Sequence, residues 1–134
     1  MADEIDWEKS LKNALDLSRK ENKLVLVAFF GATCEACIKM KTCTLITQRV
    51  QDYIKINFIP IKYESGTDSE QFMRFCVTAK PAAIVLDSEG NEIFRKIGYF
   101  EPDVFIEKLE MARKKAAHRA AKVLHIIKIK RSVH

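Results

Sequence analysis

The stretch Lys-Leu-Val-Leu-Val-Ala-Phe-Phe-Gly-Ala-Thr-Cys-Glu-Ala-Cys, residues 23–37, decides the fold. Residues 24–30 are a continuous apolar run of strand length, which is typical of a strand buried on both faces of a sheet. A Gly-Ala-Thr turn at 31–33 ends this run, and the composition of residues 34–53 predicts a helix. The sequence therefore places a Cys-x-x-Cys pair at the first turn of a helix that directly follows a buried strand.

The two cysteines of this stretch, Cys34 and Cys37, are the candidate catalytic residues. Their spacing puts both sulfurs on nearly the same face of a helix, and the free N–H groups and dipole at a helix start stabilise a thiolate on the first one. We expect Cys34 to attack a disulfide and Cys37 to resolve the resulting mixed disulfide. The same spacing is half of a structural zinc site, but there is no second Cys-x-x-Cys and no histidine before residue 113. We therefore expect no metal.

The rest of the chain alternates helices and strands. The expected elements are a helix over 7–20 capped by Asp6, a strand over 54–61, a short helix over 69–76, a hairpin over 82–97 turning at 87–90, and a helix over 103–118. Strands that alternate with helices predict an α/β domain with parallel strand pairs, and the hairpin adds antiparallel strands. The expected architecture is a mixed central sheet flanked by helices.

The chain resembles the thioredoxin superfamily, in particular its thioredoxin-like domains of the thiol:disulfide interchange type. The resemblance covers roughly residues 7–112 and is carried by the 23–37 stretch and by Thr-Ala-Lys-Pro-Ala-Ala-Ile-Val-Leu-Asp-Ser-Glu-Gly-Asn-Glu-Ile-Phe-Arg-Lys-Ile-Gly-Tyr-Phe, residues 78–100. It implies a thioredoxin-like fold in which Pro81 is a cis-proline facing the cysteine pair. It also implies that Gly98 is the glycine on the final strand.

The resemblance further implies the residues that border the site. Thr33, Lys80 and Pro81 are the expected substrate-binding residues. The chain departs from the family pattern, which commonly has Trp before the first cysteine and Gly-Pro between the two. It has Thr33 and Glu35-Ala36 there, and Ala28 replaces the buried aspartate of thioredoxins proper. These departures predict a specialised relative rather than a housekeeping thioredoxin.

Two further cysteines, Cys43 and Cys76, lie outside the motif. Free cysteine is among the most buried residue types, so we expect both to be core or half-buried thiols. The alternative is a second redox or regulatory thiol, for which Cys76 is the better candidate because it lies five residues before Pro81.

Charge divides the chain into two parts. The chain has 23 Lys and Arg and 18 Asp and Glu. Eight of the basic residues and none of the acidic residues lie in residues 113–134, so residues 1–112 have a formal charge of −3. At 134 residues and 48% hydrophobic, the chain is expected to form one domain over 1–112 with a basic helical extension over 113–134. We expect the extension's aliphatic side chains to pack on the domain or to contact an acidic protein partner. A membrane surface is the alternative, and no nucleic-acid partner is expected.

These features together predict a thiol:disulfide oxidoreductase that uses the Cys34–Cys37 dithiol to reduce or exchange disulfides in protein substrates. The predicted partners are a protein disulfide and an electron donor of unspecified identity, with no organic cofactor. The alternative is a protein-interaction module of the same fold with little turnover. No window approaches the ~18 apolar residues of a membrane span. The sequence as it stands predicts a cytoplasmic location. The alternative is a periplasmic location, which requires that an export signal has already been removed from the chain.

Overall fold

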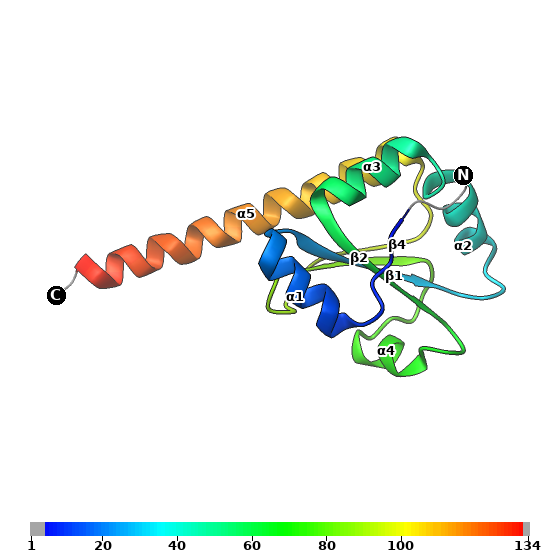
Figure 1. Cartoon of the computed structure of the whole chain (residues 1–134), viewed down its shortest axis with the longest axis horizontal. Coiled ribbons are helices and arrows are strands. Elements are labelled where there is room, and N and C mark those ends of the chain that lie inside the picture. Colours follow the sequence, from blue (N-terminus) through cyan, green and yellow to red (C-terminus); the bar gives the residue numbers. More distant parts are fainter. Residues whose placement is uncertain (1–4, 133–134) are drawn as a thin grey trace.

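Four strands form a mixed sheet in the order β2-β1-β3-β4, as seen in the computed structural model, which describes residues 5–132 (Figure 1). The strands are β1 (Leu24–Phe30), β2 (Phe58–Glu64), β3 (Ala82–Leu86) and β4 (Glu92–Ile97). β1 pairs parallel with β2 and antiparallel with β3, and β3 pairs antiparallel with β4. The predicted mixed sheet and its central first strand are confirmed.

Helices cover both faces of the sheet because side chains of β1 alternate between two cores. Leu26, Ala28 and Phe30 face a core shared with α2 (Glu35–Lys39), α3 (Gln48–Asn57) and α5 (Pro102–Ser132). The intervening β1 residues face a second core shared with α1 (Leu11–Glu21) and α4 (Ser69–Arg74). β1 is thereby buried on both sides, as its continuous apolar sequence predicts.

The first helix begins later than predicted. Ser10, not Asp6, is its N-cap, and the Ser10 hydroxyl accepts a hydrogen bond from the backbone N–H of Asn13 at 3.1 Å. Trp7 therefore precedes the helix instead of lying within it. The helix ends at Glu21, one residue beyond the predicted end, because Asn22 adopts the left-handed conformation that terminates α1.

The prediction of one continuous helix over residues 34–53 is wrong. The structure divides it into α2, a π-helical turn at Met40–Thr44 and α3. The buried Thr44 hydroxyl donates to the carbonyl of Phe100, and the Thr47 hydroxyl donates to the carbonyl of Thr44 at 2.8 Å. Such side-chain bonds to backbone compete with regular helix geometry. Because α3 continues to residue 57, the strand predicted from residue 54 begins instead at residue 58.

The last helix, α5, has 31 residues, because the helix predicted over 103–118 runs without a break into the predicted C-terminal helical extension, which is confirmed as far as residue 132. Phe105, Leu109 and Ala112 are its buried residues, and beyond them the helix projects away from the sheet (Figure 1). The expectation that the aliphatic side chains of this extension pack on the domain is wrong for its large described members, which remain 40–57% exposed: Val123, Leu124, Ile126, Ile127 and Ile129. Within residues 5–132, no helix is both long enough and apolar enough to cross a membrane.

Candidate active site

Cys34 lies where β1 has ended and α2 begins, and it serves as the N-cap of that helix. Its Sγ accepts a hydrogen bond from the backbone N–H of Cys37 at 3.1 Å. Its thiol also lies 3.6 Å from the carbonyl oxygen of Lys80, to which it donates. The side chain is half-buried, so this sulfur is the member of the pair that solvent and a substrate can reach.

Cys37 is 1% exposed and lies one helical turn further in. Its Sγ accepts the backbone N–H of Gly31 at 3.2 Å. Burial raises the pKa of the Cys37 thiol to about 11, and the neighbouring Cys34 thiol adds to this effect, while the Gly31 N–H opposes it. The pair is thus asymmetric, with one accessible sulfur and one buried sulfur that favours its neutral form.

Pro81 borders the pair from the strand side. The Lys80–Pro81 peptide bond is cis, and the Pro81 carbonyl accepts the backbone N–H of Gly98 at 2.8 Å. This hydrogen bond links the residue before β3 to the residue after β4. The carbonyl of Lys80, next to Pro81, accepts from the Cys34 thiol. Four of the predicted site residues, Cys34, Cys37, Lys80 and Pro81, are therefore gathered here, and Thr33 lies exposed immediately before Cys34.

Gly31 is a site residue that the sequence analysis did not single out. A Cβ atom at Gly31 would lie 3.1 Å from Cε of Lys80 and 3.2 Å from Cβ of Cys34. The aliphatic stem of Lys80 therefore packs over Gly31, beside the reactive cysteine. The signal available in the sequence was a glycine placed between a buried strand and a Cys-x-x-Cys pair.

The sequence profile of the thioredoxin-like domain matches residues 11–113. The chain belongs to this family. Its fold matches the DsbH oxidoreductase with a TM-score of 0.71 and 21% identity, over 84% of this chain and 87% of that one. It matches a thioredoxin from Thermus thermophilus with a TM-score of 0.68 and 23% identity, over 85% and 87% of the two chains.

The oxidised C-terminal domain of DsbD from Neisseria meningitidis is also similar, with a TM-score of 0.62 and 27% identity over 76% of this chain and 92% of that domain. No curated protein sequence matches the chain significantly. These comparisons confirm the predicted family, a thioredoxin-like domain of the thiol:disulfide interchange type, and associate the chain with thiol:disulfide oxidoreductases in general.

The interior beneath the site of this thioredoxin-like domain is apolar. Ala28, at the position of the aspartate in thioredoxins proper, is 7% exposed. It lines a cavity of about 20 Å³ together with apolar residues that include Phe30, Met40 and Pro81. A cavity of this size has room for about one water molecule. The carboxylate that the family commonly places near the buried cysteine has no counterpart at this position.

The other two cysteines of the domain are exposed, which corrects the expectation of burial. Cys43 lies in the π-helical turn, with its sulfur 3.8 Å from the hydroxyl of Thr42. Cys76 follows α4 in a left-handed conformation with a φ of 54°. Both positions lie on irregular backbone outside the faces that pack on the sheet, a placement that the burial tendency of cysteine does not encode.

Proposed function

We propose that this thioredoxin-like domain is a thiol:disulfide oxidoreductase in which Cys34 is the nucleophile and Cys37 the resolving cysteine. The observation that carries the proposal is the asymmetry of the pair. Cys34 is accessible and receives the N–H of Cys37, while Cys37 is 1% exposed with a raised pKa. Attack by an accessible thiolate and resolution by a shielded thiol is the order of events that this arrangement favours.

The proposed reaction transfers two electrons from the dithiol to a protein disulfide. The Cys34 thiolate attacks one substrate sulfur, a mixed disulfide forms, and the other substrate sulfur leaves as a thiolate that takes up a proton. Cys37 then loses its proton and attacks the Cys34 sulfur, which forms the Cys34–Cys37 disulfide and releases the second substrate thiol. A dithiol electron donor reduces the pair again, so the chemistry needs no organic cofactor or metal.

Thr33, Lys80 and Pro81 are the proposed substrate-binding residues. Thr33 is exposed beside Cys34, and the Lys80 carbonyl lies 3.6 Å from the Cys34 sulfur. A substrate segment that presents a disulfide to Cys34 would therefore also contact the Lys80–Pro81 backbone.

Between a cytoplasmic and a periplasmic location, we propose the periplasmic one, which the likeness to a Dsb-type domain supports. Release of the native protein with the periplasmic fraction would support this assignment, and retention with the cytoplasmic fraction would contradict it.

The test uses four cysteine variants and a protein disulfide such as insulin. We expect Cys34→Ser to abolish turnover and Cys37→Ser to accumulate a mixed disulfide at Cys34, which mass spectrometry locates. Cys43→Ser and Cys76→Ser are matched controls, because both thiols are exposed and lie outside the pair. Formation of the Cys37→Ser adduct at Cys43 or Cys76 instead of Cys34, or turnover by Cys34→Ser, would contradict the proposal.

A redox titration separates catalysis from the alternative, an interaction module with little turnover. We expect glutathione buffers to interconvert the dithiol and a Cys34–Cys37 disulfide reversibly, with a definable potential. A folded protein that forms no such disulfide, but still binds a partner as the Cys34→Ser variant, would favour the interaction module.

A further inference from the structure

The projecting part of α5 carries an apolar stripe that has no cover within residues 5–132. The buried face of α5 is formed by Phe105, Leu109 and Ala112, and the stripe continues that face at Ala116, Ala120, Val123 and Ile127. These last four positions are separated by four, three and four residues, the spacing by which one helix packs along another. Apart from the half-buried Ala116, residues 113–132 are all exposed. The helix thus keeps its packing face after the domain beneath it has ended.

This stripe forms one wall of a groove of about 1050 Å³. The opposite wall is the end of the domain, where the end of α1 meets the turn between β3 and β4. Glu21, Asp87 and Glu89 supply carboxylates to this wall, and Lys23, which also lines it, pairs with Glu21 at 3.2 Å. Asp87 and Glu89 therefore carry its excess negative charge. The groove therefore has a mainly apolar helical side, with Arg113 and Arg119 beside the stripe, and a polar side that contains acidic groups.

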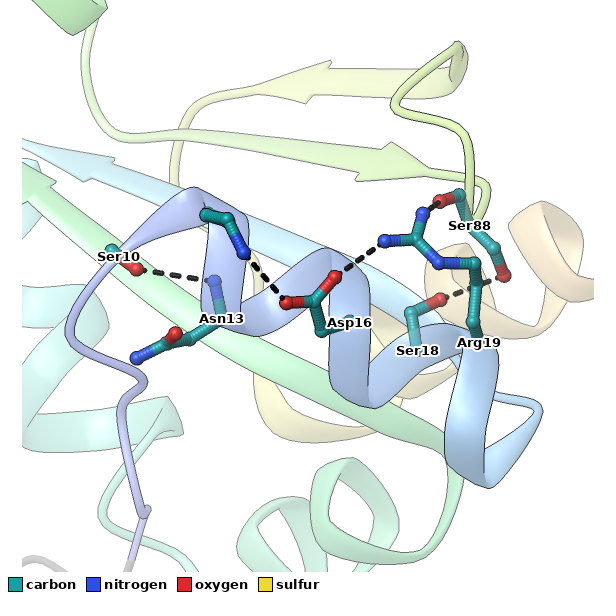
Figure 2. A network of polar contacts seen from close by, with 7 residues as sticks. Ser10, Asn13, Asp16, Ser18, Arg19 and Ser88 are labelled. Carbon is teal, nitrogen blue, oxygen red and sulfur yellow. Dashed lines mark hydrogen bonds and ion pairs between the residues drawn. The ribbon is translucent and has the colours of Figure 1, made fainter.

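The domain wall is held in place by contacts between α1 and the hairpin turn (Figure 2). The guanidinium of Arg19 donates to the Ser88 carbonyl at 2.7 Å and also pairs with Asp16 at 2.5 Å. The hydroxyls of Ser18 and Ser88 are 3.0 Å apart, and the carboxylate of Asp87 accepts the backbone N–H groups of Glu89 and Asn91 at 2.9 Å. The wall is thus formed before anything enters the groove.

Charge differs sharply between the two walls. The extension carries eight Lys and Arg and no acidic residue. Arg113 pairs with Glu110 at 2.6 Å, but along the described part of the chain no ion pair to a carboxylate involves residues 114–131. Glu89, on the acidic wall, is exposed and likewise has no ion pair there. One molecule therefore presents an unpaired basic helix end and an acidic wall that this end does not reach.

We propose that the groove receives α5 of a second copy of this chain, which lies antiparallel to the first and forms a two-fold dimer. The projecting 20 residues extend about 30 Å at 1.5 Å per residue, so two antiparallel extensions overlap along their whole length. The basic end of each helix, with Lys128 and Arg131, then lies against the acidic wall of the other copy. In such a pair the same surface serves both molecules, as two-fold symmetry requires.

Two other occupants fit the geometry less well. A lipid surface would have to reach the stripe from the side on which the domain lies, because the stripe continues the face of α5 that packs on the sheet. An acidic helix from another protein would place its carboxylates beside Asp87 and Glu89. In the antiparallel pair, Lys114, Lys115 and Lys122 lie on the side of each helix away from the stripe, which limits repulsion between the two basic helices. Of the two arginines that line the groove, Arg113 pairs with Glu110 and Arg119 donates to the Glu92 carbonyl of its own chain.

The test is the mass of the full-length protein in solution, measured by sedimentation or light scattering at micromolar concentrations. We expect the wild-type protein to be dimeric and Leu124→Asp/Ile127→Asp to be monomeric, since both side chains line the groove. The matched control is Ile126→Asp/Ile129→Asp, which makes the same change in charge at side chains that are 52% and 49% exposed and do not line the groove. We expect this control to remain dimeric.

A charge reversal tests the acidic wall separately. We expect Glu89→Lys to weaken the dimer at least tenfold and Glu70→Lys, on α4 and away from the groove, to leave it unchanged. Circular dichroism shows that each variant is folded, and insulin reduction reports the proposed catalytic function independently. A monomeric wild-type protein overturns the proposal, as does a control pair that dissociates like the groove pair. Binding of the monomer to anionic vesicles or to an acidic helical peptide through Leu124 and Ile127 also overturns it, in favour of that occupant.

Discussion

The backbone N–H of Gly31 donates to Sγ of Cys37 over 3.2 Å and so joins the end of β1 to the first turn of α2. The contact places the buried thiol directly behind the accessible Cys34. Cys37 is only 1% exposed, so its thiol has almost no contact with solvent. Burial penalises the charged form of a thiol, and this is the largest cause of the raised pKa of Cys37.

The raised pKa predicts a specific loss of stability at alkaline pH. The Cys37 thiol has a pKa near 9.0 when it is free of the fold and about 11 in the folded protein. The neutral thiol therefore contributes fully below pH 9, and its contribution is lost as the pH rises from 9 towards 11. A pKa shift of about two units corresponds to roughly 3 kcal/mol of unfolding free energy. Denaturant unfolding of the reduced protein from pH 8 to 11 measures this loss.

The control for this titration is Cys37→Ala, which lacks the buried thiol. We expect the stability difference between the wild-type protein and the variant to shrink across the interval from pH 9 to 11. Parallel stability curves for the two proteins would show that Cys37 ionises normally in the fold.

We expect Ala28→Asp to destabilise the domain, relative to the wild-type protein, more at neutral pH than at acid pH. The new carboxylate would enter the apolar cavity beneath the site, where burial raises its pKa above the unfolded value. The stability that the neutral acid retains at low pH is then lost as the pH rises through that raised pKa. We expect a cost of roughly 3 kcal/mol at pH 8, measured by denaturant unfolding.

Two further variants make the Ala28→Asp result interpretable. Ala28→Asn has nearly the same shape without a titratable group, so its destabilisation should not change with pH. Lys62 is the strand neighbour of Ala28 in β2, and Lys62→Met should increase the cost of Ala28→Asp if the ammonium reaches the new carboxylate. An Asp variant as insensitive to pH as the Asn variant would show that the cavity admits enough water to solvate the charge.

The parts of the fold that depend on local sequence were predictable. β1 follows from a continuous apolar run, and the β3–β4 hairpin follows from two strand-like runs on either side of Asp-Ser-Glu-Gly. The Cys34–Cys37 pair was predictable as a candidate site because a Cys-x-x-Cys at the start of a helix after a buried strand already implies redox chemistry. The family resemblance supplied Pro81, which lies far from the pair in sequence.

The features that the sequence did not predict depend on contacts between distant segments. The break after α2 involves the hydroxyl of Thr44 and the carbonyl of Phe100, which are 56 residues apart. The exposure of Cys43 and Cys76 depends on which backbone segments the sheet leaves uncovered. The exposure of the large aliphatic side chains on the extension depends on where the domain beneath α5 ends.

The N-cap of α1 gives a prediction that separates the observed cap from the expected one. Ser10→Ala removes the hydroxyl that accepts the N–H of Asn13 and should cost about 1 kcal/mol of unfolding free energy. Asp6→Ala should leave the unfolding free energy unchanged within experimental error, because Asp6 lies four residues before the cap. Thermal or urea unfolding compares the two variants, and a larger loss for Asp6→Ala would place the start of the helix where the sequence analysis expected it.

Truncation of a side chain at each end of α5 tests the proposed division between a domain over 1–112 and an extension over 113–134. Leu109 is 1% exposed and packs in the core, so Leu109→Ala should cost about 3 kcal/mol through lost burial and the cavity left behind. Ile129 lies on the same helix at 49% exposure and outside the groove, so Ile129→Ala should change stability by no more than about 0.5 kcal/mol. Denaturant unfolding with unchanged m-values measures both. A comparable loss for the two variants would mean that the helix beyond Ala112 is packed on the domain and that the chain forms a single unit to its described end.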